Sequence, residues 1–349
     1  MTTLLDRTIK VDYLQIKHLF NSSLQNKGNL SRLLNLMLLK NWLARLEGYM
    51  NNYSAKRQPY CLAALEKEVL ISILIIHPNN RRGSCWAISI PLVIQEPIFN
   101  SLTDIKKALL KATLEIKAQE LENIILKYPI KSNEDISIAR ELGFQPLKVY
   151  RTWSDKLDIF KDNLGSKSNN YTNSLKWESL NKINSERVWK LKISGESLHY
   201  REIINSQPID YLNRFNKLTG ILISSNGFYK NAIAGIIQKE YPLEKTTYQI
   251  VRDLAWDSRL QSELPKILNK IYLYNNEILI ETNSKDETLN NLLVNIGLIE
   301  KEEKLLLGKS NLIRKSKKSY RLQKDSWESV LGNIQSQTPP LPSPTLDQR

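Results

Sequence analysis

Residues 122–153 read ENIILKYPIKSNEDISIARELGFQPLKVYRTW, and residues 277–307 read EILIETNSKDETLNNLLVNIGLIEKEEKLLL. Each stretch has an apolar strand pattern, a polar turn, a short helical pattern that ends in glycine, and a second strand pattern. Nineteen residues separate Ile124 from Gly143, and nineteen separate Ile278 from Gly297. Because the spacing is kept while the side chains differ, the sequence predicts a duplicated unit with one copy in each half of the chain.

The bulk composition is that of a folded protein with two cores. The chain has 349 residues, of which 41% are hydrophobic and 25% are charged, and a chain of this length usually divides into two domains. The two cysteines, Cys61 and Cys85, have neither CxxC spacing nor a histidine cluster, so we expect packed thiols and no metal site. No segment reaches the roughly 20 apolar residues of a membrane span, and we expect a cytoplasmic protein.

The net charge of +14 makes polyanions candidate partners. Nucleic acid could bind such a basic surface, particularly near the basic run at residues 314–321. Elsewhere the lysines are mostly interspersed with acids, and a lysine-rich composition alone gives the same charge. Charge therefore leaves nucleic-acid binding open without selecting it.

The periodicity predicts the same order of elements in both halves. In the first half we expect a strand near residue 9, helices up to residue 50, strands at 61–65, 69–76 and 86–94, and a helix at 103–119, before the first duplicated stretch. In the second half we expect a strand at 176–180, a helical region at 186–215 interrupted by Gly195 and Pro208, strands at 220–224, 232–237 and 247–255, and a helix at 261–272. The predicted domains are 1–160 and 176–313, joined by a linker at 161–175 and followed by a disordered basic and Pro-rich tail at 314–349.

This order resembles that of the Gcn5-related N-acetyltransferase (GNAT) family. The resemblance implies an α/β (α+β) fold with two GNAT-like domains, each a mostly antiparallel central sheet flanked by helices. It also implies an N-acyltransferase that uses acetyl-CoA or another acyl-CoA as cofactor. Its acceptor would be an amine on a small molecule or a protein.

The family binds the pyrophosphate of acyl-CoA on a glycine-rich loop before a helix. The look-alike NRRGSC, residues 80–85, precedes a strand pattern, so we place it in the turn between two strands. The loops that precede the expected helices, residues 95–104 and 255–261, contain no glycine. The resemblance prefers the first half for the cofactor and assigns contacts to Val93, Ile94, Ser101, Leu102, Thr103 and Asn133, with Arg259 in the second half.

Acyl transfer to an amine needs a base and an acid. The family often has a tyrosine as acid four residues before the glycine that ends the helix, but Ala139 and Leu293 occupy that position here. For the base, the candidates are Glu66 in a hairpin, His77 at the end of a strand and Asp253 in the second half.

Three functions remain open from the sequence. The first is acyl-CoA-dependent N-acetyl transfer. The second is a non-catalytic tandem module that binds protein or RNA, and the third is tRNA-dependent aminoacyl transfer, which other tandem GNAT-like proteins perform. In each case we expect the two halves to pack against one another.

Overall fold

The computed structural model describes residues 7–10, 60–66, 69–117, 122–154, 175–212, 218–224, 231–239, 246–274 and 279–310. The predicted helices before residue 50, the linker up to residue 174 and the tail at 314–349 lie outside these ranges. Within them, no helix combines the length and apolar character needed to cross a membrane.

The first half follows the predicted order. Its elements are β1 (Arg7–Lys10), β2 (Tyr60–Glu66), β3 (Val69–Pro78), β4 (Cys85–Ile88), β5 (Leu92–Val93), α3 (Leu102–Lys117), β6 (Asn123–Pro129), α4 (Asn133–Glu141) and β7 (Gln145–Ser154). Gly143 ends the α4 segment with φ +87°, the left-handed conformation that glycine adopts without strain.

The single strand predicted at 86–94 was wrong, because the chain breaks between β4 and β5. The Ser89 amide still donates to the Ile75 carbonyl of β3 (2.8 Å), but the Ile75 amide donates to the Ser89 hydroxyl (3.0 Å) and not to a backbone carbonyl. Pro91 has no N–H to donate to a ladder. The pattern of alternating apolar residues continues through this break, so periodicity alone could not reveal it.

The second half repeats the order. Its elements are β8 (Lys176–Ser179), α6 (Ser185–Ser194), α7 (Leu198–Ile204), η2 (Pro208–Tyr211), β9 (Gly220–Ser224), β10 (Asn231–Lys239), β11 (Thr247–Arg252), α8 (Leu260–Tyr274), β12 (Leu279–Asn283), α9 (Glu287–Ile296) and β13 (Ile299–Ser310). The helical region breaks after Gly195 and before Pro208, as predicted.

The described strands form one sheet in the order β1-β2-β3-β4-β6-β13-β7-β12-β11-β10-β9-β8, with β5 attached to β3. Two of these neighbouring pairs are parallel, β4 with β6 and β11 with β12, and the others are antiparallel. Each half therefore contributes one parallel pair at the equivalent place in its element order.

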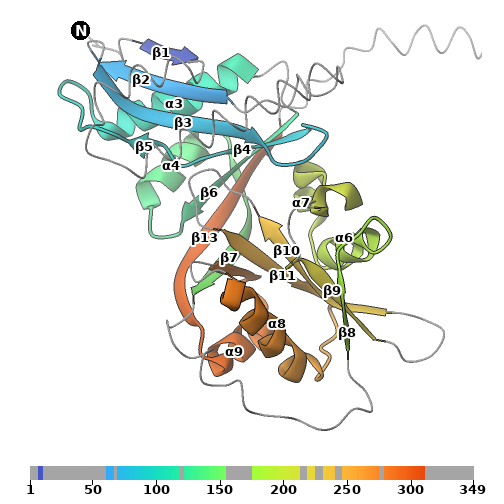
Figure 1. Ribbon diagram of the computed structural model, residues 1–349. Coiled ribbons are helices and arrows are strands. Elements are labelled where there is room, and N and C mark those ends of the chain that lie inside the picture. Colours follow the sequence, from blue (N-terminus) through green and yellow to red (C-terminus); the bar gives the residue numbers. More distant parts are fainter. Residues whose placement is uncertain are drawn as a thin grey trace, which may run out of the picture. The chain divides into compact units, whose positions relative to one another are not determined.

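The two halves exchange their last strands. β13, from the second half, lies between β6 and β7 of the first half. β7, from the first half, lies between β13 and β12, both from the second half. Figure 1 shows β13 as the long strand that runs past both β6 and β7. The halves are thus joined within one hydrogen-bonded sheet.

The NRRGSC segment forms the turn between β3 and β4, as the sequence predicted, and this turn contacts the second half. The Arg81 amide donates to Asp210 (2.8 Å), and the Arg81 guanidinium donates to the Leu212 carbonyl (2.6 Å). Arg82 donates to the Asn205 carbonyl at 2.6 Å. The turn is therefore a docking element between the halves.

Helices cover both faces of the second-half strands. α8 and α9 share a core with Tyr248 and Ile250 of β11. On the opposite face, Val188 of α6 packs with Ile237 and Val251. Figure 1 shows α6 and α7 apart from the α8–α9 pair. Because side chains alternate along a strand, Gln249 of β11 belongs to the α6 face.

Candidate functional site

The two parallel pairs end differently: β4 itself ends at its last pair, whereas β11 and β12 both run on after theirs. β4 and β6 pair as far as Ile88 with Leu126, and β11 and β12 pair as far as Gln249 with Glu281. Beyond these positions the strands no longer pair, which leaves backbone groups of β11 available on that edge. A ligand can bind such an edge through main-chain hydrogen bonds.

In the first half, the loop before α3 is held by an internal carboxylate. Glu66, at the end of β2, accepts hydrogen bonds from the amides of Ile98 (2.7 Å), Phe99 (3.1 Å) and Asn100 (3.2 Å). The Asn100 side chain adds a fourth contact at 2.8 Å. Successive amides that point at one anion form a typical anion-binding concavity. Here the anion is part of the chain.

The surroundings of Glu66 favour its charged form. The residue is only 6% exposed, and the Ile98 amide, which makes the strongest contact, lowers the pKa of the carboxyl below its ordinary value of 4.5. Burial acts in the opposite direction, and the contacts from Asn100 and Phe99 lower the pKa further. Glu66 therefore anchors this loop as an ionised group.

Replacing Glu66 by glutamine is expected to lower the midpoint of thermal unfolding by several degrees at neutral pH, because the loop amides lose their charged acceptor. Since the folded pKa is lowered, the contribution of Glu66 is present above about pH 4.5 and is lost as the pH falls through the folded pKa. The gap between wild type and variant should close below that pH. Glu96→Gln, at an exposed position of the same loop, is the control, and equal effects of both variants would refute the anchoring role.

The other first-half candidates do not gather around one site. Ser101 caps α3 by accepting the Asp104 amide (3.1 Å), and the Thr103 hydroxyl donates to Glu134 of α4. Asn133 is exposed at the start of α4, and His77 is half-buried at the end of β3, with Nδ1 3.4 Å from the Pro78 carbonyl oxygen. Three further candidates, Val93, Ile94 and Leu102, lie on β5, just after it and at the start of α3.

In the second half, a hollow of about 190 Å³ lies where β11 and β12 separate. We call it the β11 hollow. Its polar wall includes Lys148, Lys192, Glu196, Gln249, Asp253 and Asp286. Of the three candidate bases, Asp253 alone borders this hollow. Lys148 comes from β7, so the first half supplies part of the wall.

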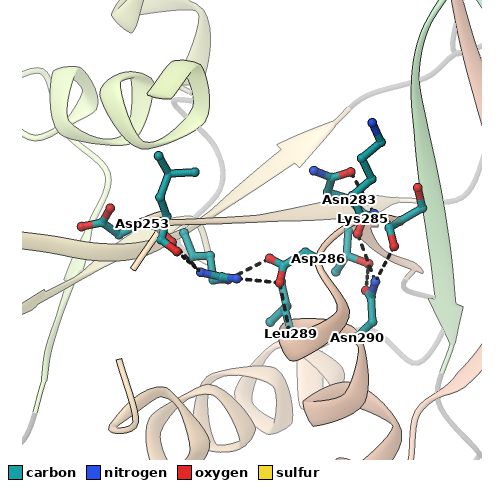
Figure 2. A network of polar contacts seen from close by, with 10 residues as sticks. Asp253, Asn283, Lys285, Asp286, Leu289 and Asn290 are labelled. Carbon is teal, nitrogen blue, oxygen red and sulfur yellow. Dashed lines mark hydrogen bonds and ion pairs between the residues drawn. The ribbon is translucent and has the colours of Figure 1, made fainter. Parts of the chain in front are cut away.

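An ion pair crosses the opening between β11 and α9. Arg252 holds Asp286 through two hydrogen bonds of 2.8 and 2.7 Å, and Asp286 caps α9 by accepting the Leu289 amide. Figure 2 shows these contacts converging on Asp286, while the Asp253 carboxylate points away from them. The guanidinium also lies 5.2 Å from the ring centre of Trp256.

A second hollow, of about 530 Å³, lies between the start of α8 and α9. We call it the α9 groove, and its wall includes Trp256, Gln261, Glu287, Thr288, Asn291 and Asn295. Arg252 borders the β11 hollow and stacks on Trp256, which borders the α9 groove, so the Arg252–Asp286 ion pair lies between the two hollows.

Arg259, the predicted phosphate contact, is held by Asp257 at 2.6 Å, which raises the pKa of the arginine.

Two buried ion pairs lie on the α6 and α7 side of the strands. Lys127 of β6 pairs with Glu281 of β12, and Lys148 of β7 pairs with Glu196, which follows α6. The Tyr150 ring centre lies 4.9 Å from the Lys127 ammonium and 5.2 Å from that of Lys148. These carboxylates therefore already have cationic partners.

Two further lysines meet beside these pairs. Lys192 of α6 is 4% exposed, and its side chain is in hydrogen-bond contact with that of Lys239 on β10. Burial lowers the pKa of Lys192, and burial together with the Lys192 charge lowers the pKa of Lys239 to about 7. Tyr211 and Glu281 oppose this shift in Lys239 more weakly.

Replacing Lys239 by methionine is expected to stabilise the protein at pH 7. Because the pKa of Lys239 is lower in the folded state than its ordinary 10.5, the wild type loses stability as the pH falls from about 10.5 to about 7. The variant lacks this loss, so its melting temperature should exceed that of wild type most at or below pH 7 and match it above pH 10.5. Melting temperature is measured against pH for wild type, Lys239→Met and the exposed control Lys111→Met. If all three curves have the same shape, the lowered pKa of Lys239 is wrong.

No family model and no curated protein sequence matches the chain. Solved structures do. The GCN5-related glucosamine N-acetyltransferase region of a fungal multi-domain β-N-acetylglucosaminidase matches with a TM-score of 0.50 at 8% identity, over 87% of this chain and 38% of that one. A Drosophila protein matches with a TM-score of 0.50 at 13% identity, over 87% and 99%. A GCN5-related N-acetyltransferase from Sphaerobacter thermophilus has a TM-score of 0.49 at 12% identity, over 88% and 97%.

The chain has the GNAT fold. The element order that the resemblance implies occurs in both halves of the chain, and each half has a parallel pair at the equivalent place. The fold class predicted from the sequence, α/β with a mostly antiparallel sheet flanked by helices, is confirmed. At these identities the likeness concerns the fold, and function has to be argued from the residues.

The resemblance places acyl-CoA between the separating strands of a GNAT fold, with its pyrophosphate on the loop before the next helix. In the first half the residues do not fit this group, because Glu66 holds the loop amides and would repel a pyrophosphate. In the second half they fit better. The unpaired edge of β11, two guanidiniums at Arg252 and Arg259, and the α9 groove are available to hold it.

Several features of the site were missed at the level of sequence. Ala139 and Leu293, at the position where the family often has a tyrosine, are fully buried. Lys192 and Gln249 were not singled out, although both line the β11 hollow. Lys192 gave a signal, since it lies four residues after the fully buried Val188 and thus on the apolar face of its helix.

Proposed function

We propose that this GNAT-fold chain is an acyl-CoA-dependent N-acyltransferase whose acceptor amine binds in the β11 hollow. The observation that carries the proposal is the position of Asp253, which borders a hollow at the separation of the second parallel pair. The sequence preferred the first half for the cofactor. We move the proposal to the second half because Glu66 already fills the anion-binding loop of the first.

Asp253 suits the role of base. Among the described residues, no donor is hydrogen-bonded to its carboxylate, and that carboxylate points away from the Arg252–Asp286 pair (Figure 2). It can therefore accept the proton that an ammonium must lose before its nitrogen attacks. When bound, an acyl-CoA would supply the acyl group as a thioester: the amine nitrogen would bond to the acyl carbon, the C–S bond would break, and CoA would leave as its thiol with the proton that the nitrogen loses as the amide forms.

Charge at the start of α8 supports cofactor binding in the same half. Arg252 and Arg259 each present a planar guanidinium, the group that binds phosphate oxygens through two parallel hydrogen bonds. Their aspartate partners, Asp286 and Asp257, hold them in place. A phosphate would have to compete with these carboxylates, so we expect micromolar or weaker affinity for acyl-CoA.

Isothermal titration with acetyl-CoA and desulfo-CoA tests the proposal at its first step. We expect saturable binding that Arg252→Met weakens and Lys111→Met, at an exposed site in the first half, leaves unchanged. Release of free CoA thiol in the presence of an amine panel then reports turnover. Absence of binding at millimolar acetyl-CoA would end the proposal.

One observation favours a second function, a non-catalytic binding module. The anion-binding loop of the first half is occupied by Glu66, and neither half has an acid at the usual tyrosine position. Such a module would show no CoA binding and no thiol release in the same experiments. It would instead retain a macromolecular partner through its surface.

A further inference from the structure

The β11 hollow has an excess of buried positive charge. Lys192 is 4% exposed and borders the hollow. Among the described residues it forms no ion pair with a carboxylate, because Glu196 is held by Lys148 and Glu281 by Lys127. Its ammonium lies 5.3 Å from the ring centre of Tyr211 and contacts the side chain of Lys239, while Glu196 and Glu281 act on its charge without pairing with it.

Lys192 is unfavourable where it lies, since burial removes hydration from its charge and a second lysine adjoins it; Glu196 and Glu281 offset this only in part. An anion bound beside Lys192 would remove both penalties. The same wall also carries Lys285, so the cationic side of the hollow extends toward α9. These lysines therefore favour a ligand that carries a negative group.

A second, independent observation comes from Gln249. This residue is 3% exposed, borders the same hollow, and its side-chain oxygen Oε1 is buried without a hydrogen-bond partner among the described residues. Buried acceptors are rarely left unpaired in folded proteins. A ligand N–H or O–H that reached Gln249 would supply the missing donor.

The volume limits the ligand. About 190 Å³ corresponds to roughly six water molecules at the ~30 Å³ that each occupies in the liquid. This space accommodates a small polar molecule. Asp253, on the same wall, provides the negative charge that an ammonium prefers.

We infer that the β11 hollow binds a small amine that also carries an anionic group, a molecule of the amino-acid class. Its anionic group lies beside Lys192, a donor reaches Gln249 Oε1, and its ammonium faces Asp253. That this molecule is the acceptor of acyl transfer depends on the function proposed above. That it binds in the hollow does not depend on that function.

Thermal-shift and calorimetric titrations of the full chain, without acyl-CoA, test this inference. The probes are L-alanine, L-glutamate and phosphoethanolamine, compared with ethylamine and glycinamide, which have no anionic group, and with inorganic phosphate, which has no amine. We expect saturable binding of at least one of the first three. Lys192→Met should weaken that binding by at least tenfold, and Gln249→Leu should weaken it measurably.

Lys190→Met is the matched control. Lys190 lies on the same helix, is exposed, and pairs with Glu186 at 2.8 Å outside the hollow. Its replacement should leave binding unchanged. Melting temperatures of the Lys192 and Gln249 variants show whether each folds, and the Gln249 variant keeps the test independent of Lys192.

Three results would overturn the inference: no binding by any probe, equal binding of amines that lack the anionic group, or binding of inorganic phosphate alone. Titration with acetyl-CoA, performed separately, tells the two proposals apart. Binding of acetyl-CoA without any amino-acid-class ligand leaves the acyltransferase standing and removes this acceptor. Binding of the small amine without acetyl-CoA keeps the hollow as a ligand site and removes the acyltransferase.

Discussion

Asparagine in place of Asp253 is expected to lower kcat by about 10²- to 10⁴-fold, the usual contribution of a positioned base. Asparagine keeps the size of the side chain and removes its ability to take a proton. Binding of acetyl-CoA should be nearly unchanged, because Asp253 is assigned to the acceptor side of the opening. The rate that remains should rise with pH as solvent hydroxide removes the proton instead.

Steady-state rates of thiol release across pH 6–9 measure this effect. Glu141→Gln is the control, since Glu141 is an exposed carboxylate on α4 that pairs with Lys107. An unchanged kcat in Asp253→Asn would place the base elsewhere. A parallel fall in acetyl-CoA affinity would instead give Asp253 a role in cofactor binding.

Removal of β13 is expected to abolish cooperative folding. A chain that ends at Leu298 loses the strand that pairs with both β6 and β7. It also exposes apolar surface that β13 shares with the first half, where Leu306 is 4% exposed and Leu307 is fully buried. Each buried leucine contributes about 1.5–3 kcal/mol, and the lost ladder adds to this, against a total stability of about 5–15 kcal/mol for a folded domain.

Circular dichroism on heating and size-exclusion chromatography measure the effect. The matched control ends at residue 313, so that it keeps β13 and lacks only the predicted tail. We expect this control to melt like the full chain. A chain ending at Leu298 with the same cooperative transition would show that β13 is dispensable to the first half.

The element order was predictable because it depends on local patterns. The duplicated endings, the breaks at Gly195 and Pro208, and the turn at residues 80–85 all have signals within a few residues. The break after Ile88 was missed although Pro91 is a local signal, because the apolar alternation continues across it. The strand exchange was missed for a related reason, since the apolar pattern of β13 is the same whichever strands it pairs with.

The candidate site was predictable only in part. Asp253 was named from the sequence and borders the β11 hollow. Glu66 was named as a base, whereas its carboxylate anchors a loop. Its partners are backbone amides 32 to 34 residues further along the chain. Because any residue has a backbone amide, the sequence does not reveal such contacts. Lys192 and Gln249 gain their meaning from burial, which tertiary structure decides.

Because of the position of Lys148, the second half needs the first half to complete its hollow. β7 brings this lysine into the wall of the β11 hollow, where it holds Glu196. A shortened descendant of the chain could therefore not discard the first half and keep the hollow intact, even though the loop of that half is filled by its own glutamate. Because β7 and β13 each pair with strands of the other half, the first half supports the hollow of the second through the same sheet that joins them.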